Sequence, residues 1–280
     1  WPDIAEHNCT VVFLLGAIAN FLWQQPRLPQ DSETPLRKVG MFPVMTEHEQ
    51  FRERFGVEIS TGYGSTECPC PVIHHFDEPL PNNQCVGFPT GRYEVEILDD
   101  NDQACATGIV GEICTRPRAP WEIMLNYWRQ PEYTAQVFRN LWYHTGDAGY
   151  RDDEGRLYFV DRLTDSMRRR GENISSMEVE DEVNQHPDVL ECAVFPVWVE
   201  HSEQEVMVVI TPQPGVTIEP EELIRFLDRR MAYFMIPRYI EFTDAIPKTP
   251  TGKTEKYKLR AKGITPRTWD RVAAGVKLSR

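Results

Sequence analysis

One lysine, carried on a loop of proline, threonine and glycine, points most directly to chemistry in this chain. Lys253 ends the run Ile246-Pro247-Lys248-Thr249-Pro250-Thr251-Gly252-Lys253. Two prolines and a glycine predict a constrained loop here rather than a helix or a central strand. A lysine presented in this way is a point charge, and an anion is the partner that suits it best. Taken alone, a Gly-Lys pair on a loop is more often a solvated turn, so the rest of the chain must decide between these interpretations.

The last residues of this loop, Gly252-Lys253-Thr254, also fit the end of a P-loop. That motif requires a glycine five positions before Gly252, and Pro247 stands there instead. Without a glycine cradle between a strand and a helix, the P-loop interpretation is excluded.

A second segment combines the groups that a nucleotide needs. Gly62-Tyr63-Gly64-Ser65-Thr66-Glu67 follows a predicted strand and offers flexible backbone, an aromatic ring, hydroxyl groups and a carboxylate. A ring can stack on a base, backbone and hydroxyl groups can bind phosphate, and a carboxylate can hold Mg²⁺. Glu67 stands where a dinucleotide fingerprint would have its third glycine, so that motif is excluded. By itself the segment is also compatible with an ordinary turn.

A third segment, Tyr143-His144-Thr145-Gly146-Asp147, predicts an aspartate after a glycine turn at the end of another strand. An acidic side chain at such a place can accept hydrogen bonds from both hydroxyl groups of a ribose. A surface turn explains the segment equally well when it is considered singly.

Hydrophobic patterns predict the elements that would position these residues. A first helix is expected over residues 17–24. A second helix is expected to begin after a cap at Thr46, with Glu49 completing the capping box, and to end at Gly56. The strands predicted up to Arg162 cover residues 11–16, 57–61, 95–98, 111–115, 142–147 and 157–160.

The chain changes character after Arg162. Residues 164–173 are polar and basic, and Ser175 with Glu178 predicts a capped helix that runs through about residue 185. Strands over 193–197, 206–211 and 239–242 and a helix after Pro220 come next. We therefore expect a compact α+β module over residues 164–280, with a boundary near Leu163–Thr164.

Length and charge narrow the class of function. The 280 residues suffice for about two domains, and the net charge of −13 argues against sequence-independent nucleic-acid binding. The basic run Arg168-Arg169-Arg170 is then a local feature, either a solvated loop or an anion contact. The longest apolar stretch, Cys9–Trp23, is broken by Asn20 and too short to span a bilayer.

The cysteines indicate the redox setting. Their number, seven, is odd and their spacing is unpaired, which favours reduced thiols and a cytoplasmic protein. Cys68-Pro-Cys70 with His74 and His75 matches no common structural zinc spacing, so we do not expect a zinc site there.

The order of the segments is more specific than any one of them. Over about 190 residues the chain carries Tyr-Gly-Ser-Thr-Glu, Gly-Glu-Ile, Thr-Gly-Asp, Asp161-Arg162, Arg170-Gly171-Glu172-Asn173-Ile174 and Pro-Lys-Thr-Pro-Thr-Gly-Lys. This series resembles the adenylate-forming superfamily of acyl-CoA synthetases, non-ribosomal peptide adenylation domains and luciferases. The run from Arg168 to Ser176 is most similar to acyl-CoA ligases of the crotonobetaine/carnitine branch. The resemblance covers nearly the whole chain.

The resemblance implies an α/β fold with two domains. Residues 1–163 would be the C-terminal portion of the large AMP-binding domain, and residues 164–280 a small mobile C-terminal α+β domain. Carried over by position, it also implies site roles: Tyr63 stacks on adenine, Gly62 and Gly64 let the backbone approach, Thr66 contacts phosphate, Glu67 holds Mg²⁺, Asp147 and Arg162 bind the ribose hydroxyls, Lys253 bridges the acyl carboxylate and the α-phosphate, and Gly171 lies beside the pantetheine arm of coenzyme A.

Two features depart from the family pattern. Thr164 stands at the hinge position, which is usually Asp or Lys. The family's Thr/Ser/Gly-rich phosphate loop is missing, because it normally lies well over a hundred residues before the Tyr-Gly-Ser-Thr-Glu segment and only 62 residues precede Tyr63. The chain therefore resembles the C-terminal part of a longer enzyme, and we expect it to be inactive alone.

The function that the resemblance implies is that of an ATP-dependent acyl-CoA ligase of fatty acid metabolism. ATP, Mg²⁺, coenzyme A and a small-molecule carboxylate would be its partners, with a homodimer left open. A non-catalytic nucleotide-binding fragment or pseudoenzyme is the alternative from another class. An adenylating ligase that loads a carrier protein is a further one, although no carrier domain or Asp-Ser acceptor follows Lys253, which weighs mildly against it.

Overall fold

The computed structural model of this protein describes residues 1–169, 172–199, 204–249 and 252–279. The chain forms two compact units, Trp1–Val160 and Asp161–Arg280, whereas the sequence placed the boundary between Leu163 and Thr164.

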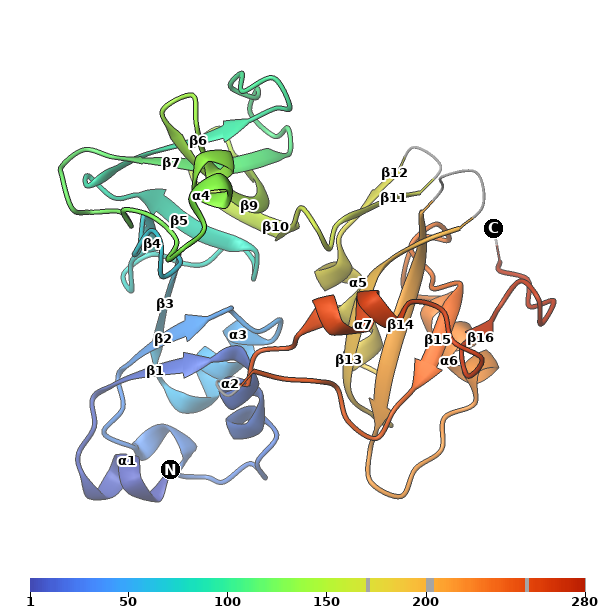
Figure 1. The fold of residues 1–280 in the computed structure, drawn as a ribbon. Coiled ribbons are helices and arrows are strands. Elements are labelled where there is room, and N and C mark those ends of the chain that lie inside the picture. The colour runs from blue at the N-terminus through green and yellow to red at the C-terminus, as the bar shows by residue number, and fades with distance from the viewer. Residues whose placement is uncertain (170–171, 200–203, 250–251, 280) are drawn as a thin grey trace. The chain divides into compact units, whose positions relative to one another are not determined.

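The first unit is a mixed α/β structure (Figure 1). Its elements in chain order are α1 (Pro2–Glu6), β1 (Val11–Leu15), α2 (Gly16–Trp23), the 3₁₀ helix η1 (Asp31–Glu33), β2 (Lys38–Phe42), α3 (His48–Phe55), β3 (Glu58–Tyr63), β4 (Val72–His74), β5 (Cys85–Pro89), β6 (Tyr93–Leu98), β7 (Gly111–Pro117), α4 (Pro131–Val137), β8 (Phe138–Arg139), β9 (Trp142–Arg151) and β10 (Leu157–Arg162).

One sheet runs through the first unit in the order β1-β2-β3-β4-β5-β10-β9-β7-β6, and β8 pairs with β9. The first three strands are parallel, and Val12, Val39 and Ile59 occupy matched positions across them. Alternate residues of these strands enter a core to which α2 contributes Ala19 and α3 contributes Phe51, as the two-residue period of a strand requires. The helices therefore cover one face of the parallel strands.

The predicted end of α3 is confirmed, and its predicted start is wrong. Gly56 caps the helix in the left-handed conformation with φ +63°, which glycine adopts without steric cost. The helix begins at His48 after Glu47, and no side chain caps it. Glu49 pairs instead with Arg52 at 2.8 Å, so the i,i+3 ion pair replaces the predicted capping box.

The second unit contains α5 (Ser176–Asn184), α6 (Pro220–Leu227) and α7 (Lys256–Lys262). Its strands are β11 (Met167–Arg169), β12 (Glu172–Ile174), β13 (Val189–Trp198), β14 (Gln204–Pro212), β15 (Tyr239–Phe242) and β16 (Trp269–Asp270), of which the last four form a sheet in chain order. The predicted cap of α5 is confirmed, because Ser175 Oγ accepts from the Glu178 amide at 3.4 Å.

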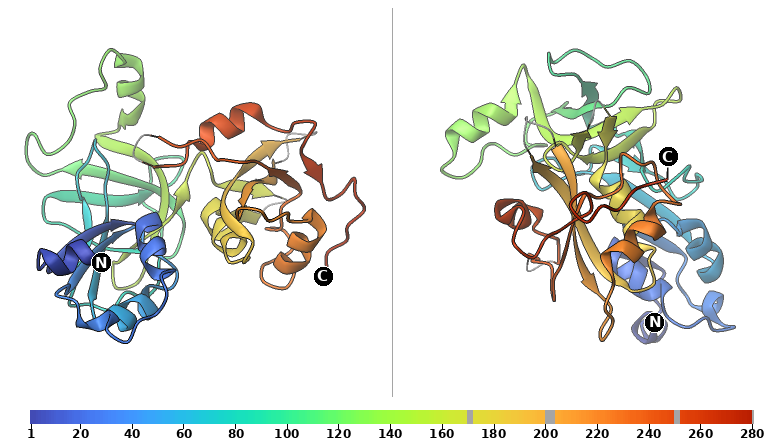
Figure 2. Two further views of the ribbon diagram at one scale, coloured as in Figure 1. Left: turned by 90° about the horizontal axis from the view of Figure 1, so that it is seen from below. Right: turned by 90° about the vertical axis from the view of Figure 1, so that its right-hand side faces the viewer.

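The two faces of this sheet carry separate apolar cores. Val194 and Val208 pack with α5 and α6, whereas the neighbouring Phe195 and Val209 pack with Leu259 of α7. Figure 2 shows α5 and α6 on one side of the sheet and α7 on the other. The nearly continuous apolar runs of β13 and β14 follow from burial on both faces.

Part of the basic stretch forms a hairpin that the sequence did not predict. β11 and β12 pair antiparallel, and Arg169 on β11 is buried. Its Nε lies 2.8 Å from the carboxylate of Glu205, and its Nη1 donates to the carbonyl of Phe234 at 2.8 Å. Arg169 is therefore a structural cation that pairs with a carboxylate of its own unit, while Arg168 is exposed.

Candidate active site

Two residues predicted to contact a nucleotide are in direct contact with each other. The hydroxyl of Tyr63, at the end of β3, donates to Asp147 Oδ2 on β9 at 2.6 Å. Burial raises the pKa of Tyr63, and the Asp147 carboxylate raises it further, so the phenol stays protonated and donates at neutral pH. The Tyr63 ring stacks with Phe159 of β10, with 6.2 Å between ring centroids. One aromatic ring and one carboxylate are thus joined at this point of the first unit.

Asp147 does not follow a turn at the end of a strand, and this part of the prediction is wrong. β9 continues through it to Arg151, and the pairing with β7 shifts between Glu112 and Cys114. Gly146 has φ +75° at this shift, which identifies a β-bulge whose conformation suits glycine. A bulge turns a side chain out of the regular alternation of a strand, and here the next residue is Asp147.

Side chains and backbone groups hold this bulge in place. Thr145 Oγ1 donates to the carbonyl of Ile113 at 2.6 Å and accepts from the Asp147 amide at 3.2 Å. Glu112 Oε1 accepts from the Gly146 amide at 2.9 Å. The bulge therefore depends on β7 through Glu112 and Ile113.

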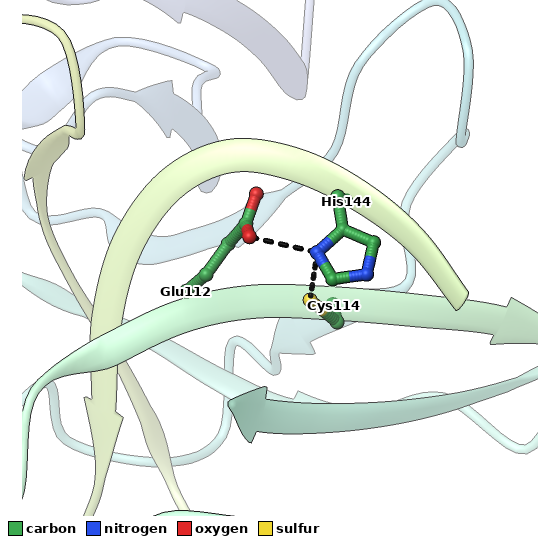
Figure 3. Close-up of side chains that lie close together, drawn as sticks. All are labelled: Glu112, Cys114 and His144. Carbon is green, nitrogen blue, oxygen red and sulfur yellow. Dashed lines mark hydrogen bonds and ion pairs between the residues drawn. The ribbon is translucent and has the colours of Figure 1, made fainter. Parts of the chain in front are cut away.

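The second oxygen of Glu112 belongs to a buried cluster with Cys114 and His144 (Figure 3). His144 Nδ1 lies 2.7 Å from Glu112 Oε2 and 3.3 Å from Cys114 Sγ. Burial raises the pKa of Cys114, and the nearby Glu112 carboxylate raises it further. The thiol therefore keeps its proton at neutral pH. Arg139 lies 3.3 Å from the same Glu112 oxygen.

Among the described residues, these three are the group whose donor atoms lie close enough together for a metal ion. Glu112 already pairs with His144, Arg139 and the Gly146 amide. Hydrogen bonds and an ion pair thus account for the cluster, whose evident effect is to fix Glu112 and with it the bulge. Glu112 belongs to the Gly-Glu-Ile motif, but its connection to Asp147 was not predicted.

The segment after β3 places Thr66 and Glu67 on a loop. Thr66 is exposed and Glu67 is half-buried. Glu67 Oε1 accepts from the Tyr127 hydroxyl at 2.8 Å, and its carbonyl accepts from the Met124 amide at 2.8 Å. A carboxylate oriented in this way is a hard oxygen donor, which fits Mg²⁺. Tyr127 has no local sequence signal and was not predicted.

Gly62 and Gly64 lie against the protein's own backbone. A Cβ at Gly62 would come within 2.7 Å of the Val72 carbonyl oxygen, and one at Gly64 within 2.5 Å of the Cys70 amide nitrogen. These contacts explain both glycines by the packing of the segment 68–72, so the approach of a nucleotide is not needed to account for them.

Lys253 lies on a tight turn of the second unit. Gly252 has φ +83° and donates its amide to the Thr249 carbonyl at 2.9 Å. The Lys253 amide donates to Thr249 Oγ1 at 3.1 Å, and the side chain is exposed. The described part of the loop thus confirms that Lys253 is carried on constrained backbone, and residues 250–251 lie outside the description.

The remaining predicted residues are distributed as follows. Arg162 ends β10 with an exposed side chain, and its amide donates to Asp161 Oδ1 at 2.7 Å. Gly171 lies outside the described residues. Tyr63 and Asp147 belong to the first unit and Lys253 to the second; the boundary falls within β10, so that Arg162 at its end is assigned to the second unit. The convergence of Asp147 and Arg162 on one ribose stays a prediction.

Comparison with family models identifies two matched regions. Residues 1–128 match the AMP-binding enzyme model, and residues 178–253 match the model of the AMP-binding enzyme C-terminal domain. Both models describe one kind of enzyme, in the chain order that the motifs suggested.

Curated relatives include the crotonobetaine/carnitine–CoA ligases of Escherichia coli and Salmonella typhimurium, each 33% identical over 93% of this chain. The match covers 51% of each relative, so the chain spans about half the length of the curated relatives it matches.

Solved structures with this fold include three enzymes of related chemistry. The amide bond synthetase McbA from Marinactinospora thermotolerans has a TM-score of 0.76 and 32% identity, covering 93% of this chain and 53% of that one. ATP-bound MatB from Rhodopseudomonas palustris has a TM-score of 0.79 and 25% identity, with coverage of 93% and 52%. The O-succinylbenzoate CoA synthetase MenE from Bacillus subtilis, in complex with AMP, has a TM-score of 0.79 and 25% identity. The match covers 96% of this chain and 53% of that one.

No helix in the described part of the chain is long and apolar enough to cross a membrane.

Proposed function

This chain belongs to the AMP-binding enzyme family, and from that premise we propose that it forms the C-terminal part of an ATP-dependent acyl-CoA ligase. A carboxylate oxygen attacks the α-phosphorus of ATP, the bond to pyrophosphate breaks, and an acyl-adenylate forms. The thiolate sulfur of coenzyme A then attacks the acyl carbon, and AMP leaves. The observation that carries the proposal is the hydrogen bond between Tyr63 and Asp147, because it supports a shared site for a base and a ribose.

In this proposal the first unit binds the nucleoside. The Tyr63 ring contacts adenine, Asp147 accepts hydrogen bonds from the ribose hydroxyls, and Thr66 contacts phosphate. Phe159 and the Asp147 carboxylate restrict the motion of Tyr63, so less side-chain entropy is lost when a nucleotide binds. Arg162 would add a cation beside the ribose.

Adenylation brings two anions together, and cationic groups must offset their repulsion. The exposed ammonium group of Lys253 would bridge the acyl carboxylate and the α-phosphate. Glu67 would hold Mg²⁺, which supplies positive charge at the phosphate oxygens when bound. The hydroxyl of Tyr127 orients the Glu67 carboxylate for that task.

The second unit would act as the mobile C-terminal domain. In the thioester half-reaction Gly171 would lie beside the pantetheine arm, where a side chain would obstruct it. All seven cysteines of the chain have free thiols, which supports a cytoplasmic enzyme.

The full-length protein, a panel of carboxylic acids and ATP test this proposal, with products identified by mass spectrometry. We expect AMP and an acyl-CoA when coenzyme A is the acceptor. A thioester formed only on a carrier protein would identify the carrier protein as the acceptor in place of coenzyme A. An amide would identify an amine as the acceptor, and the similar enzyme McbA is an amide bond synthetase. The absence of carboxylate-dependent ATP cleavage would favour a non-catalytic nucleotide-binding protein.

A further inference from the structure

The loop that carries Lys253 closes on a short stem. The Glu255 amide donates to the Pro247 carbonyl at 2.9 Å, and the Thr249 amide donates to the Lys253 carbonyl at 2.8 Å. We define these four residues as the stem of the loop. Helix α7 begins directly after the stem, at Lys256. A side chain that fixes the start of α7 therefore also fixes the backbone from which Lys253 projects.

Lys256 is the side chain that fixes the start of α7. Its ammonium group lies 2.8 Å from Glu180 Oε1 and donates to Ser176 Oγ at 2.7 Å. Both acceptors belong to α5 and lie one turn apart on one face of that helix. Glu180 Oε1 also accepts from the Val194 amide of β13 at 2.6 Å. The Lys256 side chain is 14% exposed, so this cation is bound by groups of its own unit, whereas Lys253 is exposed.

The contacts of Lys256 continue to the backbone of Arg162, the other cation of the second unit that the proposed function assigns to the nucleotide. The Ser176 amide donates to Asp161 Oδ2 at 2.5 Å, and Asp161 Oδ1 accepts from the Arg162 amide at 2.7 Å. Asp161 is buried, so both hydrogen bonds are shielded from water. A chain of direct contacts thus joins the start of α7 to the Arg162 amide.

Helix α7 reaches the same backbone by a second route. Arg260, one turn after Lys256, forms an ion pair with Asp165. The amides of Asp165 and Ser166 donate to the Arg162 carbonyl at 2.9 Å and 2.8 Å. The amide and the carbonyl of Arg162 are therefore both held by groups that α7 supports. The Lys253 loop and the end of β10 share this short helix as a common support.

A partly buried ion pair can serve stability alone, and the place of this pair gives it a further consequence. In the proposed function, Lys253 must reach the carboxylate and the α-phosphate at the same time. A displacement of about 1 Å at such a group can cost about a hundredfold in rate. Thioester formation from an acyl-adenylate that is already made does not use Lys253. A residue that only positions the Lys253 loop should therefore affect the first half-reaction and spare the second.

We propose that Lys256 is a positioning residue for acyl-adenylate formation, which holds the Lys253 loop in register with the Arg162 backbone. It acts through Glu180 and Ser176 and touches no substrate. The kinetic consequence rests on the proposed function. The structural part, that Lys256 holds the stem, does not depend on any activity.

Hydrogen exchange followed by mass spectrometry tests the structural part without substrate. In full-length Lys256→Met, peptides that contain Thr249 and Glu255 should exchange at least about tenfold faster, because the hydrogen bonds of the stem lose their anchor. Leu223→Ala is the stability control, because it opens a cavity in the core beside α6 and leaves the stem contacts in place. Stem exchange in Lys256→Met that is no faster than in Leu223→Ala would overturn the proposal.

The two half-reactions test the kinetic part on the same protein. In Lys256→Met the kcat of carboxylate-dependent ATP–pyrophosphate exchange should fall at least about tenfold, with the KM for ATP changed by less than about threefold. CoA-dependent consumption of supplied acyl-adenylate should stay near the rate of the unchanged protein. Equal loss in both half-reactions would show a general loss of folded protein and would overturn the positioning role.

A double variant tests whether Lys256 acts through Glu180. Glu180→Gln removes the charge of the carboxylate and should also slow pyrophosphate exchange selectively. The double variant should lose no more than Lys256→Met alone, because both changes break one contact. Losses that add would show that the two residues act independently, which contradicts the proposal.

The measurements also separate this inference from the proposed function. If the unchanged full-length protein shows no carboxylate-dependent exchange, the proposed function fails, and hydrogen exchange still decides whether Lys256 holds the stem. If the unchanged protein is active and Lys256→Met alters neither stem exchange nor the ratio of the half-reactions, the positioning role alone is overturned.

Discussion

The hydroxyl of Tyr63 and the carboxylate of Asp147 are joined by a 2.6 Å hydrogen bond across 84 positions of sequence. Tyr63 lies at the end of β3 and Asp147 at a bulge of β9. Because the Tyr63 hydroxyl donates a hydrogen bond to the Asp147 carboxylate, the aromatic ring and the carboxylate restrict each other's motion. Their relationship gives a physical basis for a nucleoside site in the first unit.

Asp147→Ala in the full-length protein should weaken AMP binding by about ten- to a hundredfold, as loss of hydrogen bonds to a charged acceptor predicts. Tyr63→Phe keeps the ring and removes only the hydroxyl, so it should weaken binding less. Calorimetric titration with AMP measures both. Unchanged affinity in Asp147→Ala would contradict the assignment of this carboxylate to the ribose.

Glu112→Ala should weaken ribose recognition by Asp147, because Glu112 holds the bulge that carries Asp147. Without the acceptor for the Gly146 amide, Asp147 is no longer held, and the preference for ATP over 2′,3′-dideoxy-ATP should fall. KM ratios for the two nucleotides measure this preference. Glu94→Ala is the control, because Glu94 pairs with Arg116 on a neighbouring strand. An unchanged ratio with lower thermal stability would assign Glu112 a purely structural role.

The 280-residue chain alone should have little or no adenylation activity, whereas the full-length protein should be active. The family's phosphate loop is missing from this sequence, and loss of a positioned phosphate clamp costs orders of magnitude in rate. Carboxylate-dependent ATP–pyrophosphate exchange measures the difference. Strong exchange by the purified chain would show the prediction to be wrong.

Lys253→Ala in the full-length protein should abolish adenylation selectively. Its charge is needed when carboxylate meets α-phosphate, so the loss should appear in turnover more than in binding. Thioester formation from supplied acyl-adenylate should remain largely intact. Pyrophosphate exchange and CoA-dependent consumption of acyl-adenylate measure the two steps. Equal loss in both would indicate a folding or binding defect, and near-normal rates in both a solvated turn.

Lys256→Met should destabilise the second unit in a pH-dependent way. Lys256 Nζ lies 2.8 Å from Glu180 Oε1. Burial raises the pKa of Glu180, and Lys256 opposes that rise. Removing the lysine raises the pKa of Glu180 further. The folded state then holds the Glu180 proton more tightly, and keeping Glu180 charged costs more free energy. The loss of unfolding free energy, about 2 kcal/mol at neutral pH, should therefore shrink as the solution becomes acidic.

Urea denaturation at several pH values measures this loss. Lys258→Met is the control, because Lys258 is 48% exposed on the same helix and pairs with Glu255. A loss that is independent of pH would show that Lys256 acts through packing alone.

Local residue choices determined much of this structure. The Ser175 hydroxyl, the left-handed Gly56 and the apolar runs of β13 and β14 act within a few residues, so their outcome follows from backbone geometry and periodicity. The ordered motifs also identified the family without any knowledge of contacts. Thr46 does not cap α3, which begins at His48, and Glu49 pairs with Arg52 instead.

Only the tertiary structure decided which of these residues meet. The sequence placed Asp147 after a turn, and the pairing of β9 with β7 placed it on a bulge held by Glu112. The sequence left Arg169 open between a solvated loop and an anion contact, and the structure pairs it with the carboxylate of Glu205 on β14. Such contacts depend on strand order and register, which bring together residues far apart in the chain. Local propensity carries no information about them, because the free energy of each contact arises only when both elements are packed.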